Sequence, residues 1–173
     1  VAVALVVAGA GTALPKASGV DDAVFDHDGQ ITKRPVRALA MSALAPKPGE
    51  MLWDIGGGSG SIAIEWLLSH DTTNAISIER DPARAARIRA NADALGVDRL
   101  QVVEGVAPDA LVGLPKPDAV FIGGGLSDAL LAALPTRLSP GARLVAHAVT
   151  LEAEALLANC PAAKGGDLLR IGL

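Results

Sequence analysis

The chain has 173 residues, which suits one domain with a sizeable core and leaves little room for two. Half of the residues are hydrophobic, only 2 % are aromatic and the formal net charge is −4, so neither stacking on single strands nor a general attraction for nucleic acids is expected. The single cysteine, Cys160, excludes an intramolecular disulfide and a thiolate metal cage, and it favours an intracellular, cytoplasmic protein without a metal centre.

Residues 1–11 read VAVALVVAGAG and are the only candidate for a targeting or membrane segment. This run is shorter than the roughly 20 apolar residues of a bilayer span and lacks the basic region of a signal peptide, so no membrane partner is expected. We interpret residues 1–18 as the tail of an upstream domain with its linker, and residues 19–173 as a single domain. An extra edge strand of that same domain explains the run equally well.

The rest of the chain alternates short β-rich runs with helix patterns. Strands are expected at residues 50–56, 74–79, 100–105, 117–125, 142–149 and 167–173. Helices are expected at residues 61–68, 126–138 and 151–160, and between Asp81 as a cap and Gly96 as a stop. Strands without clear alternation, each followed by a helix, indicate a doubly wound, mostly parallel α/β sheet.

Ahead of the sheet, Thr32 is predicted to cap a helix over residues 33–45. We expect this helix to lie over the mouth of the sheet. Its apolar face is expected to contain Val36, Leu39, Ala40, Ala43 and Leu44.

A glycine-rich loop, DIGGGSG at residues 54–60, joins the first strand to its helix. Ligands of open α/β sheets bind at this edge, and glycines let a backbone pass against a flat ligand. Glu79 closes the second strand, 21 residues after Gly58, where a carboxylate can accept hydrogen bonds from both ribose hydroxyls. The candidate ligand-binding residues of the loop are Asp54, Gly56, Gly57, Gly58, Ser59 and Gly60.

Three classes of ligand fit a glycine-rich loop. A phosphate-binding Walker loop ends in Gly-Lys-Ser/Thr, and no lysine occurs here. The dinucleotide pattern G-x-G-x-x-G/A is satisfied by residues 58–63, but the carboxylate of Asp54 would repel a pyrophosphate and suits an ammonium group. S-adenosylmethionine offers an ammonium and a ribose, so the pattern favours a class I methyltransferase. Dinucleotide binding and a plain glycine turn remain alternatives.

The ends of the third and fourth strands give information about cofactor contacts and about the class of substrate. Backbone groups at Val106 and Ala107 are expected to contact the adenine edge of the cofactor. The fourth strand ends in VFIGGG at residues 120–125 and lacks an N-P-P-Y-type motif, which weighs against methylation of nucleic-acid nitrogens.

The stretch from His27 to Trp66, together with EGVAPDAL, FIGGG and AVTLE further on, resembles the precorrin C15-methyltransferase/decarboxylase family of cobalamin biosynthesis. The resemblance runs from about Phe25 to the end of the chain, and GQITK at residues 29–33 is its most specific part. In this family the domain is free-standing or the C-terminal half of a bifunctional precorrin-6Y C5,15-methyltransferase. The apolar N-terminal run favours the fused form.

The resemblance implies that Thr32, residues 56–60, Glu79 and Ala107 line an S-adenosylmethionine site. It implies methyl transfer to the C15 bridge carbon of a tetrapyrrole, loss of CO₂ from the C12 acetate side chain, and a homotetramer. The chain departs from the family at His147, where relatives often carry Asn, and it ends before the last strand of a seven-stranded methyltransferase sheet.

The candidate cations for the substrate carboxylates are Lys33, Arg34 and Arg37, and Gly124 is a further candidate for substrate contact. His147 and Glu65 are candidate catalytic residues, because the first ends a strand on the ligand side and the second follows the glycine loop by about one helical turn. A solvated helix face and a structural histidine are the competing interpretations. A methyltransferase for another small molecule or RNA, an NAD-dependent oxidoreductase and a nucleotide-sensing module are the alternative functions.

Overall fold

The computed structural model describes residues 13–164 and 166–171. The apolar run at residues 1–11 therefore lies outside the described residues. No helix in the described ranges combines the length and the apolar character needed to cross a bilayer.

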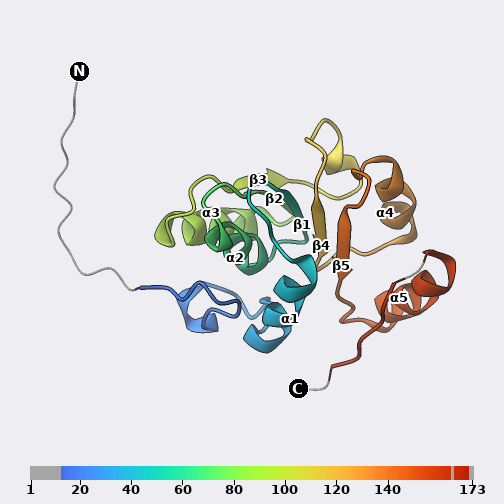
Figure 1. Ribbon diagram of the computed structural model, residues 1–173, viewed down its shortest axis with the longest axis horizontal. Coiled ribbons are helices and arrows are strands. Elements are labelled where there is room, and N and C mark those ends of the chain that lie inside the picture. The colour runs from blue at the N-terminus through green and yellow to red at the C-terminus, as the bar shows by residue number, and fades with distance from the viewer. Residues whose placement is uncertain (1–12, 165, 172–173) are drawn as a thin grey trace.

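A five-stranded parallel sheet forms the centre of the fold (Figure 1). Its strands are β1 (Met51–Ile55), β2 (Asn74–Glu79), β3 (Gln101–Glu104), β4 (Ala119–Ile122) and β5 (Arg143–Ala146). The spatial order is β3-β2-β1-β4-β5, so the chain reverses its direction of travel across the sheet after β3. Ile55 at the end of β1 is in register with Ile78 of β2 and Ile122 of β4. The predicted doubly wound parallel sheet is confirmed.

Five α-helices accompany the strands in the described part of the chain: α1 (Arg34–Leu44), α2 (Ser61–Ser69), α3 (Pro82–Ala94), α4 (Asp128–Ala133) and α5 (Leu151–Lys164). Short 3₁₀ turns lie at Asp22–Val24, Asp109–Leu111 and Leu134–Thr136. Asp81 caps α3 as predicted, because its side chain accepts hydrogen bonds from the backbone of Ala83 and Arg84. The predicted helix over residues 126–138 is shorter in the structure, since Pro135 cannot donate a backbone hydrogen bond and the chain tightens there.

Both faces of the sheet are buried, which explains why its strands lack alternation. On one face, α1, α2 and α3 pack on alternate strand residues such as Leu52 and Phe121. On the other, Trp53 and Ile76 pack with Leu130 of α4. Figure 1 shows α2 and α3 on one side of the strands and α4 on the opposite side. Because the three central strands β2, β1 and β4 are covered on both faces, the ligand-binding edge is left at the ends of the strands.

Helix α1 differs from its prediction in cap and in face. Lys33, not Thr32, is the N-cap residue, and its side chain makes no capping hydrogen bond. The buried stripe consists of Arg37, Ala40, Met41 and Leu44, whereas the predicted Leu39 and Ala43 are exposed. The prediction chose the face by its apolar residues, so it included Ala40 and Leu44 but could not include the buried arginine that begins the stripe.

The predicted sixth strand is wrong for the residues that the structure describes. Residues 166–171 form no strand and are exposed, and the last two residues of the prediction lie outside the described range. Strand β5 is therefore one edge of the described sheet. A strand needs a ladder of partner hydrogen bonds, which a local apolar pattern does not record.

Candidate functional site

A cavity of about 470 Å³ opens at the carboxyl ends of the strands. Loops that follow all five strands reach it, and the segment before α1 forms a further wall. The lining residues are Gln30, Ile31, Thr32, Lys33, Val36, Ile55, Gly56, Gly57, Gly58, Ile78, Glu79, Arg80, Arg84, Gly105, Val106, Ala107, Gly123, Gly124, Gly125, His147 and Val149. This volume is typical of a site for a small molecule.

The glycine loop after β1 is shaped first by the protein itself. Gly56 has φ +76°, and a Cβ atom there would lie 2.6 Å from the backbone nitrogen of Gly124 in the loop after β4. A Cβ at Gly57 would lie 2.0 Å from the Ser77 hydroxyl of β2. These glycines allow neighbouring strand ends to meet closely, so the loop forms the floor of the cavity.

Glu79 is the carboxylate best placed to recognise a ligand. Its Oε2 accepts a hydrogen bond from the backbone N–H of Gly58 at 2.9 Å, and its Oε1 accepts one from Asp81 at 3.0 Å. A carboxylate has about four acceptor positions, so each oxygen keeps one for a ligand. The side chain is held in place, lines the cavity and fits the two hydroxyls of a ribose.

Asp54 lies beneath the loop and not among the residues that line the cavity. It is 1 % exposed, and its carboxylate accepts hydrogen bonds from the Ser77 hydroxyl and from the backbone of Ala63. Burial raises the pKa of the Asp54 carboxyl to about 7. Asp54 therefore does not line the cavity in this structure, and its predicted role towards a ligand ammonium, directly or through water, stays a prediction.

Ser59 and Gly60 also lie outside the cavity lining. The Ser59 hydroxyl is buried without a hydrogen-bond partner among the described residues, and its carbonyl accepts from the Asn91 amide at 2.9 Å. Gly60 is the N-cap of α2. These residues fix where the loop enters its helix.

We call residues 25–33 the strap, and the last four of them form a further wall of the cavity. Gln30, Ile31, Thr32 and Lys33 of the strap line the cavity, and the Gln30 carbonyl lies 3.2 Å from the position of a Cβ at Gly58. The GQITK stretch that carried the resemblance is thus part of the site.

Arg37 is completely buried and does not reach the cavity, so its predicted contact with a substrate is wrong. Its guanidinium pairs with Glu65 at 2.6 Å and with Asp22 at 2.9 Å, and it donates to the carbonyls of Val20 and Thr32. The partners lie on three different segments, which explains why the sequence around Arg37 gave no sign of its burial.

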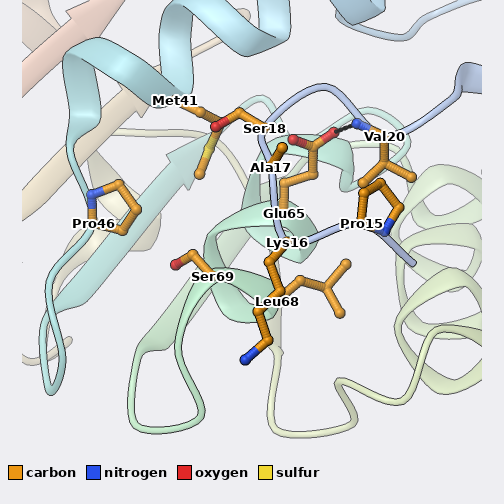
Figure 2. Close-up of a pocket in the computed structure, with 10 residues that line it drawn as sticks. All are labelled: Pro15, Lys16, Ala17, Ser18, Val20, Met41, Pro46, Glu65, Leu68 and Ser69. Atoms are coloured by element: carbon orange, nitrogen blue, oxygen red, sulfur yellow. Dashed lines mark hydrogen bonds between the residues drawn. The ribbon is translucent and has the colours of Figure 1, made fainter. Parts of the chain in front are cut away.

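Glu65 is likewise buried, and its predicted position towards a substrate is wrong. Its carboxylate accepts hydrogen bonds from the backbone of Gly19 at 2.8 Å and Val20 at 2.9 Å, besides Arg37. Figure 2 shows Glu65 beside a separate cavity of about 30 Å³ that is bordered by residues 15–18. This space holds about one water molecule, which is too little for a substrate. Through its hydrogen bonds to Gly19 and Val20, Glu65 instead attaches that segment to α2.

The other predicted substrate contacts divide between the cavity and the surface. Lys33 and Gly124 line the cavity, whereas Arg34 does not and lies 3.8 Å from Asp21 on the surface. Val106 and Ala107 also line it, and their contact with an adenine edge stays a prediction.

His147 lines the cavity at the end of β5. Its ring packs edge-on against Phe121 with 4.8 Å between the ring centroids, and its backbone N–H bonds to Ile122. Burial lowers the pKa of His147 below its usual value. At neutral pH the ring is therefore uncharged and able to accept a proton.

Arg80 and Arg84 also line the cavity and were not singled out from the sequence. The sequence could have indicated both arginines, since Arg80 directly follows the strand-ending Glu79 and Arg84 lies in the first turn of the next helix.

The chain matches the model of the precorrin methyltransferase domain over residues 23–173. It is 61 % identical to the precorrin-6Y C(5,15)-methyltransferase (decarboxylating) of a Sinorhizobium species, over 92 % of this chain and 39 % of that protein. It is 35 % identical to the probable cobalt-precorrin-6B C(15)-methyltransferase (decarboxylating) of Pyrobaculum calidifontis, over 78 % of this chain and 71 % of that protein.

A solved structure agrees with these relatives. The C-terminal domain of precorrin-6Y C5,15-methyltransferase from Rhodobacter capsulatus superposes with a TM-score of 0.88 at 52 % identity, covering 92 % of this chain and 86 % of that one. The chain spans about two fifths of the length of the first curated relatives that it matches, 39 % and 40 %. The resemblance that the sequence indicated is confirmed, and the chain belongs to the precorrin methyltransferase domain family.

Proposed function

We propose that this domain uses S-adenosylmethionine to methylate the C15 bridge carbon of a precorrin and removes CO₂ from its C12 acetate side chain, within cobalamin biosynthesis. Family membership favours this activity over the oxidoreductase and the sensing module. The structural observation that carries the proposal is Glu79, whose carboxylate is fixed by Gly58 and Asp81 and keeps acceptor positions for a ribose.

The residues of the cavity fit such a cofactor. Glu79 would accept the ribose hydroxyls, the backbone around Val106 and Ala107 would contact the adenine edge, and the loop through Gly58 would lie under the methionine part. The bound cofactor supplies an electrophilic methyl group. Thr32, from the strap, would close the cavity on the opposite side.

The substrate carries several carboxylates, so its binding requires cations at the cavity. Lys33 and Arg80 line the cavity and make no ion pair within the described part of the chain. We assign them to the substrate carboxylates, in place of the buried Arg37. Gly124, which has no side chain, leaves space for the macrocycle beside the glycine loop.

The chemistry demands positioning more than a strong base. A bridge carbon between reduced pyrroles is enamine-like and attacks a methyl group in line, so holding the two reactants together supplies most of the rate. When the acetate loses CO₂, the electron pair of the broken carbon–carbon bond enters the conjugated ring. We propose that the neutral His147 ring, which lies in the cavity, takes the proton that C15 loses on methylation and returns it to the side-chain carbon that has lost CO₂.

Replacing His147 tests this role. His147→Gln is expected to keep cofactor binding and to slow conversion of a precorrin by about 10²-fold, the lower range for a lost proton-transfer group. Conversion is followed by mass spectrometry under single-turnover conditions. An unchanged rate would assign His147 to packing against Phe121 alone.

Calorimetry with S-adenosylhomocysteine and NAD tests the cofactor. We expect S-adenosylhomocysteine to bind and NAD not to, and Glu79→Ala to weaken binding by at least about tenfold through the lost charge-assisted hydrogen bonds. Glu104→Ala is the matched control, since Glu104 ends the neighbouring strand in register with Glu79 but pairs with Arg89 on the surface. Tight binding of NAD alone would contradict the proposal.

We also propose that the domain belongs to a longer bifunctional protein, as the longer curated relatives suggest, with an upstream tetrapyrrole methylase domain. A homotetramer and a cytoplasmic location are proposed with it, from the family resemblance and the single cysteine. Light scattering of the purified chain and fractionation of its native cells are the tests, and a monomer or an exported protein would contradict them.

A further inference from the structure

The strap is fixed at two points that lie on either side of its middle. At one end, the Asn91 amide accepts from the Asp26 backbone N–H and donates to the Asp26 carbonyl, each at 2.9 Å. At the other end, buried Arg37 donates to the Thr32 carbonyl. Gly29 between them has φ +96°, and no atom lies within 4 Å of a Cβ built there. These two attachments leave the middle of the strap between them.

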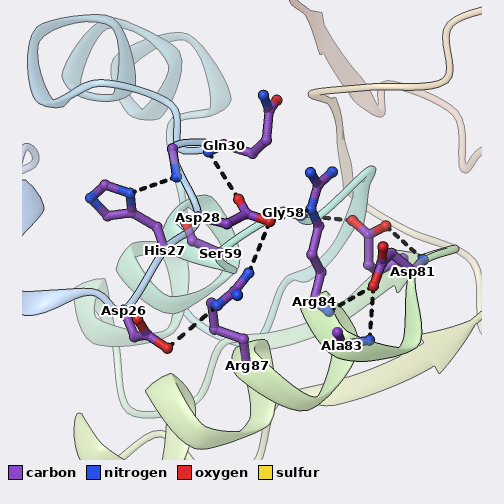
Figure 3. A network of polar contacts seen from close by, with 12 residues as sticks. Asp26, His27, Asp28, Gln30, Gly58, Ser59, Asp81, Ala83, Arg84 and Arg87 are labelled. Carbon is purple, nitrogen blue, oxygen red and sulfur yellow. Dashed lines mark hydrogen bonds and ion pairs between the residues drawn. The ribbon is translucent and has the colours of Figure 1, made fainter.

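Asp28 attaches the middle of the strap (Figure 3). Its Oδ2 accepts from Nε of Arg84 at 2.9 Å and lies 3.2 Å from a terminal nitrogen of Arg87, both on α3. Its Oδ1 accepts from the backbone N–H of Gln30 at 3.1 Å. The Arg84 guanidinium holds the pKa of the Asp28 carboxyl well below its usual range, so this carboxylate is charged at neutral pH.

This ion pair joins two walls of the cavity. Arg84 lines the cavity in the first turn of α3, and Gln30 lines it from the strap, next to Gly58. With Asp28 engaged, the strap is held over the glycine loop and the Arg84 guanidinium is held towards the strap. Without it, the Arg84 guanidinium loses its partner on the strap and shares the cavity with the Glu79 carboxylate, which lines it too. Arg84 would then compete with a ribose for Glu79.

We propose that Asp28 is a positioning residue that latches the strap to α3 and sets how long the methyl donor stays bound. The proposal rests on the proposed function of the same cavity. Asp28 does not line the cavity itself, and it acts through Gln30 and Arg84, which do.

Asp28→Asn tests the latch with little disturbance of the fold, because the residue is on the surface and the amide oxygen still accepts from Gln30. We expect S-adenosylhomocysteine to dissociate about fivefold faster, as two partly exposed ion pairs are lost. Raising the salt from about 0.05 to about 0.5 M should accelerate dissociation from the unmodified chain and leave the variant nearly unchanged, since salt screens the pairs. Stopped-flow fluorescence with a displacing ligand measures both rates.

Asp26→Asn is the matched control. Asp26 is two residues away. Among the described residues its carboxylate pairs with Arg87 alone, at 3.4 Å with its side chain 78 % exposed, while its backbone stays bound to Asn91. The same charge is removed from the strap, and the dissociation rate is expected to change by less than about twofold. The latch would be overturned if Asp28→Asn released S-adenosylhomocysteine at the same rate as the unmodified chain. It would also be overturned if both variants released it equally faster.

Hydrogen exchange without any ligand separates this proposal from the function. The backbone amides of residues 28–31 should exchange faster in Asp28→Asn and not in Asp26→Asn, because only the first variant frees the middle of the strap. Unchanged exchange would overturn the latch even if cofactor binding is normal. Failure of the unmodified chain to bind S-adenosylhomocysteine would instead overturn the proposed function.

Discussion

Asp54 shows how one buried carboxyl ties the stability of the domain to pH. The glycine loop covers it, and burial raises its pKa in the folded chain to about 7, against about 3.9 in an unfolded chain. The folded state thus binds the proton more tightly between these values. The stability contributed by protonated Asp54 is fully present below about pH 4 and is lost as the pH rises towards 7.

Asp54→Asn should remove this pH dependence. In the unmodified chain, the contribution of Asp54 to the free energy of unfolding falls with a slope of up to about 1.4 kcal/mol per pH unit across that interval. The neutral amide keeps an acceptor for Ser77 and Ala63 and does not titrate, so the variant should have a flatter profile. Urea unfolding at pH 5, 6, 7 and 8 measures the difference. Parallel profiles of the two chains would show that Asp54 does not carry this proton.

At the level of the elements, the contact between the loops after β1 and β4 shapes the floor of the site. An alanine at Gly56 would combine a positive φ of +76° with a Cβ 2.6 Å from the Gly124 backbone, which cannot rotate away. Gly113 has nearly the same φ, +79°, but no atom lies within 4 Å of its Cβ position. Comparing an alanine substitution at each of the two glycines therefore separates the cost of backbone strain from the cost of steric crowding.

Gly56→Ala is expected to destabilise the domain far more than Gly113→Ala. The control variant should lose about 1 kcal/mol from the positive φ, whereas Gly56→Ala should lose at least about 2 kcal/mol more through overpacking. It should also weaken binding of S-adenosylhomocysteine, because the loop must move. Chemical unfolding and calorimetry measure these effects. Similar losses in both variants would mean that the two loops tolerate separation.

The elements were predictable where local chemistry determines them. The strands of a doubly covered parallel sheet are continuous apolar runs, and the Asp81 cap and the glycine loop are local signals that the structure retains. Arg37 was assigned to the substrate because it lies close to Thr32 at the predicted mouth of the sheet. Glu65 was a catalytic candidate because it follows the glycine loop by about one helical turn. Each is the other's partner across 28 residues, and no local pattern records such a pairing. Asp28 was missed for the same reason, since Arg84 is 56 residues away.

In the whole molecule, the described residues that precede the strap are attached to the rest of the domain. Leu14 packs against the core, and Gly19 and Val20 donate to Glu65, which also binds Arg37. Through Arg37, the same cluster reaches the Thr32 carbonyl of the strap. Leu14, Gly19 and Val20 therefore belong to the same contact network as the strap. The boundary that we predicted at residues 18 and 19 stays a prediction.

Conversion of a precorrin tests the central claim most directly. The chain is incubated with S-adenosylmethionine and a precorrin whose C15 is unmethylated, and the product is examined by mass spectrometry, with Glu79→Ala as the control. We predict that the product gains one methyl group and loses one CO₂, and that the variant converts far less of it. A substrate that stays unchanged while the cofactor binds, or that gains a methyl group and keeps its acetate carboxylate, would contradict the proposed function.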